Sequence, residues 1–429
     1  MINHLEAIIM RDETKCLHAG YTPGNAEPRV LPIVQSITYA YDTAEEIAKV
    51  FDDPTLSLVY SRFGNPTVMA VEDKIAALEG GVGAMCTTSG QAATLLAVLN
   101  ICGAGDHIVS LGSIYGGTTN LFIVTLKRLG ITTTFVSNDD SDEAIEAAFT
   151  DRTRLVWGET MANPAMAVLD IERFARIAHD HGVPLIVDNT FATPVFCKPI
   201  EFGADIVVHS TSKYMDGHAV QIGGVIVDGG TFDWTNGKFP ELTEPDESYH
   251  GISYTKAYGR AAYITRARMN LMRDFGVYPA AHSAFLLNLG LETLPVRMRQ
   301  YHENGLRVAR YLQENPKVLS VKFPALKTDK DHALYKKYLK GSCAVISFTI
   351  KGGREKAMAF LDALKLVSNE VHVADIRTCI LHPASSTHRQ CTDEQLRAAG
   401  IDEGLVRLSV GLENVEDILA DLAQAFDAI

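Results

Sequence analysis

The sequence predicts an α/β fold with a mainly parallel sheet, because short apolar segments alternate with amphipathic ones through the middle of the chain. The strand-like segments are residues 107–111, 131–136, 154–159, 184–187, 205–208 and 223–227. Segments with helical periodicity separate several of these strands, at residues 119–129, 142–149 and 171–181. This alternation is typical of a parallel sheet covered by helices on both faces, with ligand-binding groups at the ends of its strands.

Length and composition indicate a large globular protein. A chain of 429 residues is long enough for two or three domains. The formal net charge of -13, from 39 basic and 52 acidic residues, disfavours nucleic acid as a partner. The seven cysteines are odd in number and form no CxxC pair. They therefore indicate a reducing compartment and argue against a disulfide framework or a structural zinc site.

No targeting or membrane-spanning segment is expected. The first ten residues carry no basic cluster, and the apolar patch at residues 7–10 is too short for a secretory signal. Residues 80–105 carry no charge, but polar side chains interrupt them, which favours a buried helix over a membrane span. We therefore expect a cytoplasmic protein that has no membrane partner.

Residues 1–62 predict an extended arm. They contain few periodic segments, and prolines stand at positions 23, 28, 32 and 54. Arms of this kind usually lie on a partner subunit. Residues 65–79 then predict a helix, with Pro66 in the first turn and apolar side chains spaced along one face.

A turn at Ser89, Gly90 and Gln91 leads into a predicted helix that extends to residue 102. Free backbone amides at the N-terminus of a helix form a natural phosphate-binding site. Ser-Gly pairs also occur in ordinary turns, so this motif alone indicates no particular ligand.

Lys213 is the first candidate for a reactive group. It follows an apolar run at residues 206–208 and a polar cluster that includes Ser210 and Ser212. A lysine amine condenses with an aldehyde to a Schiff base, and neighbouring hydroxyls can bind a phosphate group, as in pyridoxal phosphate. The alternative is a surface lysine where a strand passes into a loop, because most lysines are exposed.

Asp188 ends a second apolar run, at residues 184–187. A carboxylate at the end of a buried strand requires a cationic partner, and a pyridinium nitrogen would supply one. The alternative is an aspartate that caps a helix or turns a loop. Asp188 and Lys213 together, each after a predicted strand, favour a pyridoxal-phosphate site.

Eight motifs in a consistent order carry a resemblance to a known family. They are YSRFGNPT (60–67), TTSGQAA (87–93), YGGT (115–118), ETMANP (159–164), VDNT (187–190), HSTSKY (209–214), HPASSTH (382–388) and VRLSVGLE (406–413). On these motifs the sequence resembles the Cys/Met-metabolism family of pyridoxal-phosphate enzymes over nearly the whole chain. The resemblance implies the aspartate-aminotransferase-like fold, fold type I, with pyridoxal 5'-phosphate as the cofactor.

The resemblance also implies roles for individual residues. Lys213 would carry the cofactor and transfer protons, and Tyr115 would stack on the ring and act as a second proton-transfer group. Asp188 would face the pyridine nitrogen, and Asn163 would bond the ring hydroxyl. The phosphate-binding set would be Ser89, Gly90, Gln91, Ser210 and Ser212, together with Tyr60 and Arg62 from the arm of the partner subunit.

Arg407, in a predicted strand, matches the family's clamp for the substrate α-carboxylate. The planar guanidinium suits this paired hydrogen bonding better than a lysine amine does. His372 aligns where relatives usually carry serine or asparagine beside that carboxylate. A histidine can change its charge near neutral pH, so His372 is a second candidate substrate-binding residue that bears on substrate preference.

Two further positions depart from the family pattern. Gly117 stands where the methionine γ-lyase branch carries a cysteine, which disfavours that branch. Ser212 stands where the family often has threonine, and it keeps one hydroxyl for the phosphate. The polar segment 228–254 resembles an insertion typical of acyl-homoserine sulfhydrylases.

The predicted organisation is an arm at 1–62, a large cofactor domain at 63–282 that includes the insertion 228–254, and a small α+β domain at 283–429. Residues 254–273 predict a helix that leads toward the smaller domain. If Tyr60 and Arg62 act across subunits, the protein is at least a dimer. Relatives are usually tetramers built from two active dimers, and the resemblance implies the same here.

The activity implied is γ-replacement on O-acetyl-L-homoserine with sulfide or a thiol, giving L-homocysteine (or methionine) and acetate, as in methionine and cysteine biosynthesis. A succinyl ester remains open as the substrate. The nearest alternative is methionine γ-lyase activity, which releases α-ketobutyrate, ammonia and methanethiol. Cystathionine synthase or lyase activity is a further branch.

Two other classes of function fit these residues less well. A non-catalytic scaffold has no chemical need for all of Lys213, Asp188, Tyr115 and Arg407. A metal-dependent hydrolase on His209 and His218 lacks a third ligand at a recognisable spacing, so no metal site is expected.

Overall fold

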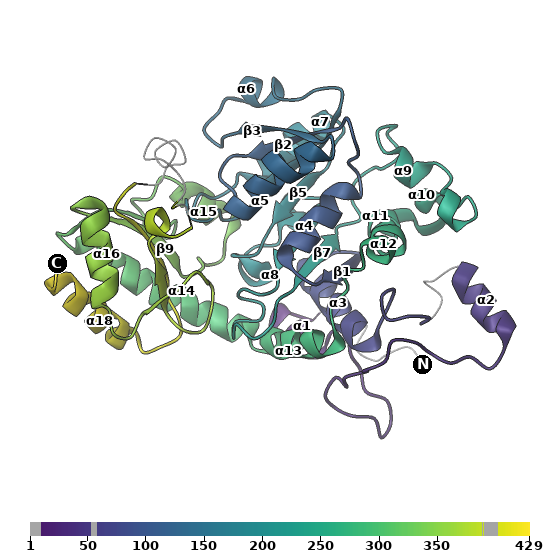
Figure 1. Cartoon of the computed structure of the whole chain (residues 1–429), viewed down its shortest axis with the longest axis horizontal. Coiled ribbons are helices and arrows are strands. Elements are labelled where there is room, and N and C mark those ends of the chain that lie inside the picture. Colours follow the sequence, from purple (N-terminus) through teal and green to yellow (C-terminus); the bar gives the residue numbers. More distant parts are fainter. Residues whose placement is uncertain (1–9, 53–57, 388, 390–401) are drawn as a thin grey trace.

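The structure is a computed structural model that describes residues 10–52, 58–387, 389 and 402–429. Within these residues the chain forms a seven-stranded sheet with the order β1-β7-β6-β5-β4-β2-β3. The strands are β1 Gly83–Thr87, β2 His107–Leu111, β3 Thr132–Val136, β4 Thr153–Glu159, β5 Leu185–Asp188, β6 Ile206–Ser210 and β7 Gly224–Asp228. Figure 1 shows this sheet in the middle of the molecule, with helices around it.

The five strands β3, β2, β4, β5 and β6 are parallel, and β7 pairs antiparallel with both β6 and β1. The expected fold class, a mainly parallel sheet in an α/β protein, is confirmed. Strand β1 was not expected, because residues 80–105 were interpreted as one buried helix that begins after a turn. The first part of that segment pairs with β7 instead, and the helix α4 starts only at Gly90.

The helices are α1 Asp12–His18, α2 Ala44–Asp52, α3 Pro66–Glu79, α4 Gly90–Leu99, α5 Gly116–Asn120, α6 Asp142–Glu146, α7 Ile171–Asp180, α8 Thr193–Phe196, α9 Pro240–Thr243, α10 Tyr254–Tyr258, α11 Ala262–Arg266, α12 Arg273–Phe275, α13 Ala281–Glu292, α14 Leu294–Glu314, α15 His332–Tyr338, α16 Gly353–Ala363 and α18 Val415–Asp427. Two π-helical segments follow α5 and α11, at Leu121–Leu126 and Ala267–Met272. Residues 254–273 are thus not one helix, since Gly259 ends α10 with a positive φ of 53°.

Local capping explains where two site-bearing helices begin. The Asn65 side chain accepts a hydrogen bond from the Thr67 amide at 3.0 Å, and Pro66 occupies the first position of α3. Ser89 caps α4 in the same way, because its Oγ accepts from the Ala92 amide at 3.1 Å. The cap fixes the direction in which the first backbone N–H groups of α4 point out of the helix.

A second sheet of five strands has the order β10-β11-β12-β9-β8. Its strands are β8 Val318–Lys322, β9 Val345–Ile350, β10 Ser368–Asn369, β11 Cys379–Leu381 and β12 Leu405–Ser409. Helices α14, α16 and α18 pack around this sheet, which lies at the left of Figure 1. The central strand β12 carries Arg407, so this sheet supplies one wall of the site described below.

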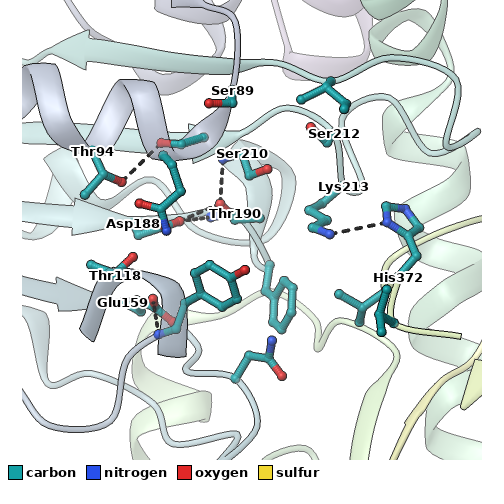
Figure 2. Close-up of a pocket in the computed structure, with 18 of the residues that line it drawn as sticks. Ser89, Thr94, Thr118, Glu159, Asp188, Thr190, Ser210, Ser212, Lys213 and His372 are labelled. Atoms are coloured by element: carbon teal, nitrogen blue, oxygen red, sulfur yellow. Dashed lines mark hydrogen bonds between the residues drawn. The ribbon is translucent and has the colours of Figure 1, made fainter. Parts of the chain in front are cut away.

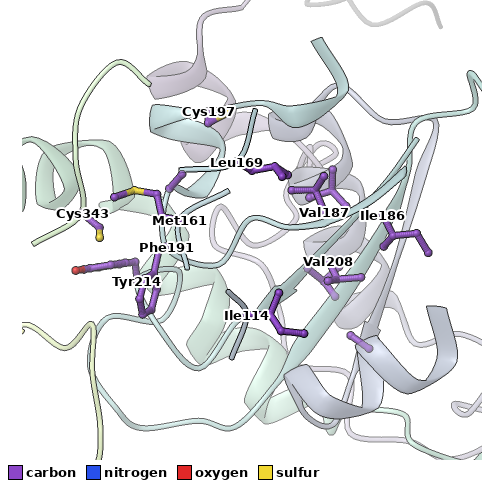
Figure 3. Packing of buried hydrophobic residues seen from close by; sticks show 14 of the residues in the cluster. Ile114, Met161, Leu169, Ile186, Val187, Phe191, Cys197, Val208, Tyr214 and Cys343 are labelled. Atoms are coloured by element: carbon purple, nitrogen blue, oxygen red, sulfur yellow. The ribbon is translucent and has the colours of Figure 1, made fainter. Parts of the chain in front are cut away.

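The core anchors the segment that carries Lys213. Tyr214 is fully buried, and its hydroxyl accepts a hydrogen bond at 3.0 Å from the Ala344 amide, next to β9. Its ring packs edge-on against Tyr301 of α14, with 4.8 Å between ring centroids. Figure 3 shows Tyr214 beside Phe191 and Met161 among the buried apolar side chains. The residue after Lys213 is therefore fixed to both sheets.

The N-terminal segment is less extended than its prolines predict, because it contains α1 and α2. Helix α1 packs against α3 and α13. The segment after it loops away from the body at the lower right of Figure 1 and leaves Val30 and Ile37 exposed. The residues weighed for a secretory signal, up to position 9, lie outside the described residues. No helix of the described residues is long and apolar enough to cross a membrane.

The segment 228–254 folds into short turns held by one carboxylate. Asp246 accepts hydrogen bonds from the Tyr254 hydroxyl at 2.7 Å and from Asn270 Nδ2 at 2.6 Å. None of these residues lines the large cavity at the ends of the parallel strands. The insertion therefore adds no wall to that cavity within one chain.

Candidate active site

A cavity of about 770 Å³ opens where β4, β5 and β6 end and faces the loop before β11. Eleven of the residues selected from the sequence line it together: Ser89, Gly90, Gln91, Tyr115, Asn163, Asp188, Ser210, Ser212, Lys213, His372 and Arg407. Figure 2 shows several of them pointing into the same space. A parallel sheet presents its ligand-binding groups at this edge.

Lys213 lies in the turn after β6, with its amine in the cavity. Burial lowers the pKa of this amine from 10.5 to about 8, and the nearby positive charge of Arg407 acts in the same direction. The neutral amine is the form that attacks an aldehyde. The surroundings of Lys213 thus increase the fraction of reactive amine near neutral pH.

Asp188 ends β5 and is oriented by its neighbour Thr190. Its Oδ1 accepts from the Thr190 amide at 2.9 Å and from the Thr190 hydroxyl at 2.5 Å. Burial raises the pKa of Asp188, whereas the two bonds from Thr190 lower it. No basic side chain of the described residues forms an ion pair with Asp188. A cation in the cavity would therefore find a fixed, unpaired carboxylate.

Glu159 ends the neighbouring strand β4 and was not selected from the sequence. Its Oε1 accepts from the Tyr115 amide at 2.6 Å, and the Asn163 amide also donates to this carboxyl group. Glu159 therefore ties together two residues of the cavity wall. Burial and the charge of Asp188 raise its pKa well above the usual range.

The phosphate-binding candidates surround the N-terminus of α4. Gly90 lies so close to β6 that an added Cβ would stand 2.6 Å from Ser210 Cβ. Ser212 Oγ accepts from the Gly223 amide at 3.0 Å, which fixes the hydroxyl beside the turn that carries Lys213. Serine hydroxyls and helix-terminal amides meet here, and this combination suits a phosphate group.

Asn163 enters the cavity from the segment after β4. Its Oδ1 is buried and has no hydrogen-bond partner among the described residues. A buried amide oxygen without a partner is costly, and a ligand hydroxyl would satisfy it. This is the position that the family resemblance assigns to the bond with the cofactor's ring hydroxyl.

Arg407 reaches the cavity from β12 of the smaller sheet. One of its nitrogens, Nη2, donates to the backbone carbonyls of Val371 at 2.9 Å and His372 at 3.2 Å. The side chain is buried, which lowers its pKa, yet no carboxylate of the described residues pairs with it. A substrate carboxylate would supply the missing counter-charge.

Tyr60 and Arg62 do not line the cavity of their own chain. The Arg62 guanidinium lies over the Tyr60 ring, 5.1 Å from its centroid, and its Nε is buried without a hydrogen-bond partner. Their position is consistent with a function outside their own subunit. Their assignment to the site of the partner subunit stays a prediction.

The two histidines weighed as metal ligands have other partners. His209 Nε2 lies 2.7 Å from Glu79 Oε1 in the core, and His218 Nδ1 contacts the Asp216 carbonyl at 2.7 Å. Among the described residues no cluster of three or more histidine, cysteine, aspartate or glutamate side chains could hold a metal ion.

Comparison with known proteins assigns the family. The family model for Cys/Met metabolism PLP-dependent enzymes matches residues 13–427. The chain belongs to this family. The match spans both sheets and every residue that lines the cavity.

Relatives with assigned activities align over nearly the whole chain. An O-acetyl-L-homoserine sulfhydrylase of Corynebacterium glutamicum is 45% identical, and the alignment covers 97% of each chain. An O-acetyl-L-homoserine sulfhydrylase of Thermus thermophilus is 44% identical over 97% of this chain and 100% of its own. The structure is also similar to that of a candidate O-acetylhomoserine (thiol)-lyase of Campylobacter jejuni, with a TM-score of 0.94 and 34% identity over 97% of this chain and 100% of the other. That structure contains a pyridoxyl-lysine monophosphate.

The cavity of this family member fits pyridoxal phosphate. Asp188 offers an unpaired carboxylate, Asn163 an unpartnered amide oxygen, and Gly90 a backbone that Ser210 approaches closely. Lys213 lines the same cavity with an amine of lowered pKa. The protein is thus a pyridoxal-phosphate enzyme whose own residues supply a place for the ring, the phosphate and the aldehyde.

Proposed function

We propose that the protein catalyses γ-replacement on O-acetyl-L-homoserine, in which sulfide or a thiol displaces acetate to give L-homocysteine or methionine. Relatives that share 41–45% of its sequence are named sulfhydrylases and homocysteine synthases. The observation that carries the proposal is that relatives with these names align over 97–98% of the chain. Gly117 also stands where the γ-lyase branch carries a cysteine, which disfavours that alternative. In the net reaction the Cγ–O bond breaks, a Cγ–S bond forms, and the sulfhydryl proton is released.

A side chain at Gly117 would collide with the side chains of Tyr115 and Gln91 as they stand. A Cβ on this residue would lie 2.4 Å from Cε1 of Tyr115 and 2.7 Å from Nε2 of Gln91. Real Cβ atoms do not approach other atoms so closely. The cysteine that the γ-lyase branch carries here would therefore require Tyr115 to move, which supports assignment to the replacement branch.

Each residue of the chain has a separate task in this reaction. Pyridoxal phosphate, when bound, supplies an electron sink for the electrons released at Cα. Arg407 binds the substrate α-carboxylate and thereby orients the Cα–H bond. Lys213, as a neutral amine, removes the Cα proton and returns protons to the carbon chain. Asp188 holds a fixed negative charge at the pyridine nitrogen, which stabilises the ring in its cationic form.

The proposed activity is tested by incubating purified, cofactor-loaded protein with sulfide and one of three esters: O-acetylhomoserine, O-succinylhomoserine or O-acetylserine. The product is homocysteine from either homoserine ester and cysteine from O-acetylserine, and we expect the fastest product formation from O-acetylhomoserine. Methanethiol in place of sulfide should give methionine and so rank the two nucleophiles. Homocysteine formation that is fastest from the succinyl ester, or absent from both homoserine esters, would contradict the proposal.

We further propose that the active form is at least a dimer, in which the arm supplies Tyr60 and Arg62 to the site of the partner subunit. The exposed apolar side chains of the arm and the unpartnered Arg62 Nε support this arrangement. We also propose that two such dimers form a tetramer. The proposed domains remain the arm at 1–62, the cofactor domain at 63–282 and the small domain at 283–429. A cytoplasmic location is proposed from the unpaired cysteines among the described residues.

The shared site can be tested by mixing inactive variants. Arg62→Ala removes the arm's contribution to the partner's site, and Lys213→Ala removes the reactive amine of its own site. An oligomer of either variant alone should therefore be inactive. A mixed oligomer should recover about a quarter of the native activity at equal ratio, because one site in two is intact in half of the dimers. No recovery on mixing would contradict the exchange of residues between subunits.

A further inference from the structure

His372 approaches the catalytic lysine more directly than its sequence alignment predicts. The alignment places it beside the substrate carboxylate, whereas in the structure its Nδ1 lies 3.4 Å from Lys213 Nζ. Figure 2 shows the two side chains facing each other across one end of the cavity. The two residues are 159 positions apart and come from opposite sides of the site.

The loop that carries His372 is held in place on three sides. Arg407 Nη2 donates to the carbonyls of Val371 and His372. The Cys379 thiol donates to the His372 carbonyl at 3.3 Å, and the Ala374 amide donates to Ser409 Oγ at 2.8 Å. The imidazole is therefore presented to Lys213 by a fixed backbone.

The imidazole is neutral in this position. Burial lowers its pKa from 6.5 to about 4, and the positive charges of Lys213 and Arg407 act in the same direction, opposed by Asp375. The other titratable groups of the surroundings are Cys379 on β11 and, across the cavity, Tyr115, Glu159 and Asp188. Near neutral pH His372 can therefore accept a hydrogen bond at one ring nitrogen.

The charge of Lys213 determines the tautomer of His372. An ammonium group only donates, so while Lys213 is protonated Nδ1 is the acceptor of the 3.4 Å contact and the ring proton resides on Nε2. Nε2 is buried and has no partner among the described residues. The contact with Lys213 is thus the hydrogen bond that orients the ring.

We propose that His372 is a positioning residue for Lys213, whose amine donates a hydrogen bond to Nδ1 whenever it is not joined to the cofactor. A lysine side chain has many rotamers, and a fixed acceptor restricts the free amine to the neighbourhood of the substrate carbons. His372 itself takes up no proton from the substrate. The proposal rests on the proposed function of Lys213 and adds to it a group that orients its amine.

The test measures the pKa of Lys213 in the full-length chain freed of cofactor. Acetic anhydride labels neutral amines, and peptide mass spectrometry follows labelling at Lys213 between pH 6 and 11. In the native chain the rate should be half-maximal at about pH 8. His372→Phe keeps the burial but removes the acceptor that favours the ammonium form, so the pKa of Lys213 should fall by about one unit.

Two variants serve as controls. His372→Asn offers an amide oxygen as acceptor, so it should return the pKa of Lys213 to within about half a unit of the native value. His282→Gln removes a histidine from the exposed side of α13 and should leave the pKa unchanged. Recovery of cofactor absorbance on reconstitution shows that each chain is folded. An unchanged pKa of Lys213 in His372→Phe, or equal shifts in the Phe and Asn variants, would overturn the proposal.

A second measurement uses the native chain alone and needs no variant. Nitrogen-15 NMR of histidine-labelled native chain should show one ring with the proton on Nε2 that titrates far below pH 6, at about 4. A ring in the opposite tautomer at this site would overturn the proposal.

In the loaded enzyme, His372→Phe should lower kcat about tenfold and leave KM for the ester within about twofold, because the amine and not the carboxylate clamp is affected. A raised KM at unchanged kcat would instead assign His372 to substrate binding. Lys213 labelling involves no substrate. Failure of the O-acetylhomoserine reaction is therefore distinguishable from failure of this proposal.

Discussion

Glu159 and Asp188 stand directly opposite each other at the ends of the neighbouring parallel strands β4 and β5. Both pKa values are raised by burial, and that of Glu159 is raised further by the charge of Asp188. Each carboxyl group accepts two hydrogen bonds, Asp188 from Thr190 and Glu159 from two backbone amides, but the pKa of Glu159 is raised well above its usual range. Glu159 is therefore the carboxyl group that holds the proton, and Asp188 is the one that keeps the negative charge.

The first prediction follows from the neutral state of Glu159. Glu159→Gln preserves an oxygen that accepts from the Tyr115 amide and removes no charge, so kcat should stay within about threefold of native. Glu159→Leu leaves the buried amides of Tyr115 and Asn163 without an acceptor and should lower kcat at least about tenfold. Steady-state homocysteine formation by the two variants measures the difference. A Gln variant as impaired as the Leu variant would show that Glu159 acts through charge.

The second prediction concerns the charge of Asp188. Asp188→Asn keeps the size of the side chain and loses the anion that would face the pyridine nitrogen, so kcat should fall by about 10²–10³. Absorbance of the bound cofactor should remain, because Lys213 and the phosphate-binding groups are unchanged. Single-turnover rates of the Asn variant provide the measurement. A kcat within threefold of native would contradict the assigned role.

The third prediction is a pH dependence. Burial and Arg407 lower the pKa of Lys213 to about 8, so attachment of pyridoxal phosphate to the stripped chain should accelerate up to about pH 8 and level off above it. Below the pKa the amine is protonated, and each pH unit should cost about tenfold in rate. Arg407→Gln removes a positive charge and should move the plateau to higher pH. A rate that still rises from pH 9 to 10 in the native chain would contradict the lowered pKa.

The fourth prediction uses two adjacent glycines as a matched pair. Gly117→Ala places a Cβ 2.4 Å from the Tyr115 ring, whereas at Gly116 nothing lies within 4 Å of the added atom. We expect Gly117→Ala to lower kcat at least about tenfold through displacement of Tyr115, and Gly116→Ala to stay within about twofold. Equal effects of the two substitutions would show that the helix start, not Tyr115, is responsible.

Lys213 and Asp188 could be found from the sequence because each follows a strand-like apolar run and places a charged group at its end. The same signal exists at Glu159, the last residue of the predicted strand 154–159. The hydrogen-bond partners of Glu159 are backbone amides, which cannot be recognised in a sequence. Glu159 was therefore not predicted as a site residue. The proposed phosphate-binding residues were predicted from their motifs and not from periodicity.

Other features depend on tertiary contacts. Strand β1 forms because Gly83–Thr87 pairs with β7, more than 130 positions away, although its residues continue without a break into α4. The contact between His372 and Lys213 depends on how the smaller sheet faces the larger one. Helix α2 was not expected, because it lies in a segment whose prolines at 28, 32 and 54 indicate extended chain.

The measurement that most directly tests replacement against elimination follows two products in two parallel reactions. Loaded protein is given O-acetylhomoserine with sulfide, and in a parallel reaction L-methionine alone, while homocysteine and α-ketobutyrate are quantified. We predict that homocysteine predominates with the ester and that methionine yields little α-ketobutyrate. Dominant α-ketobutyrate from methionine would move the protein to the γ-lyase branch and contradict the interpretation of Gly117.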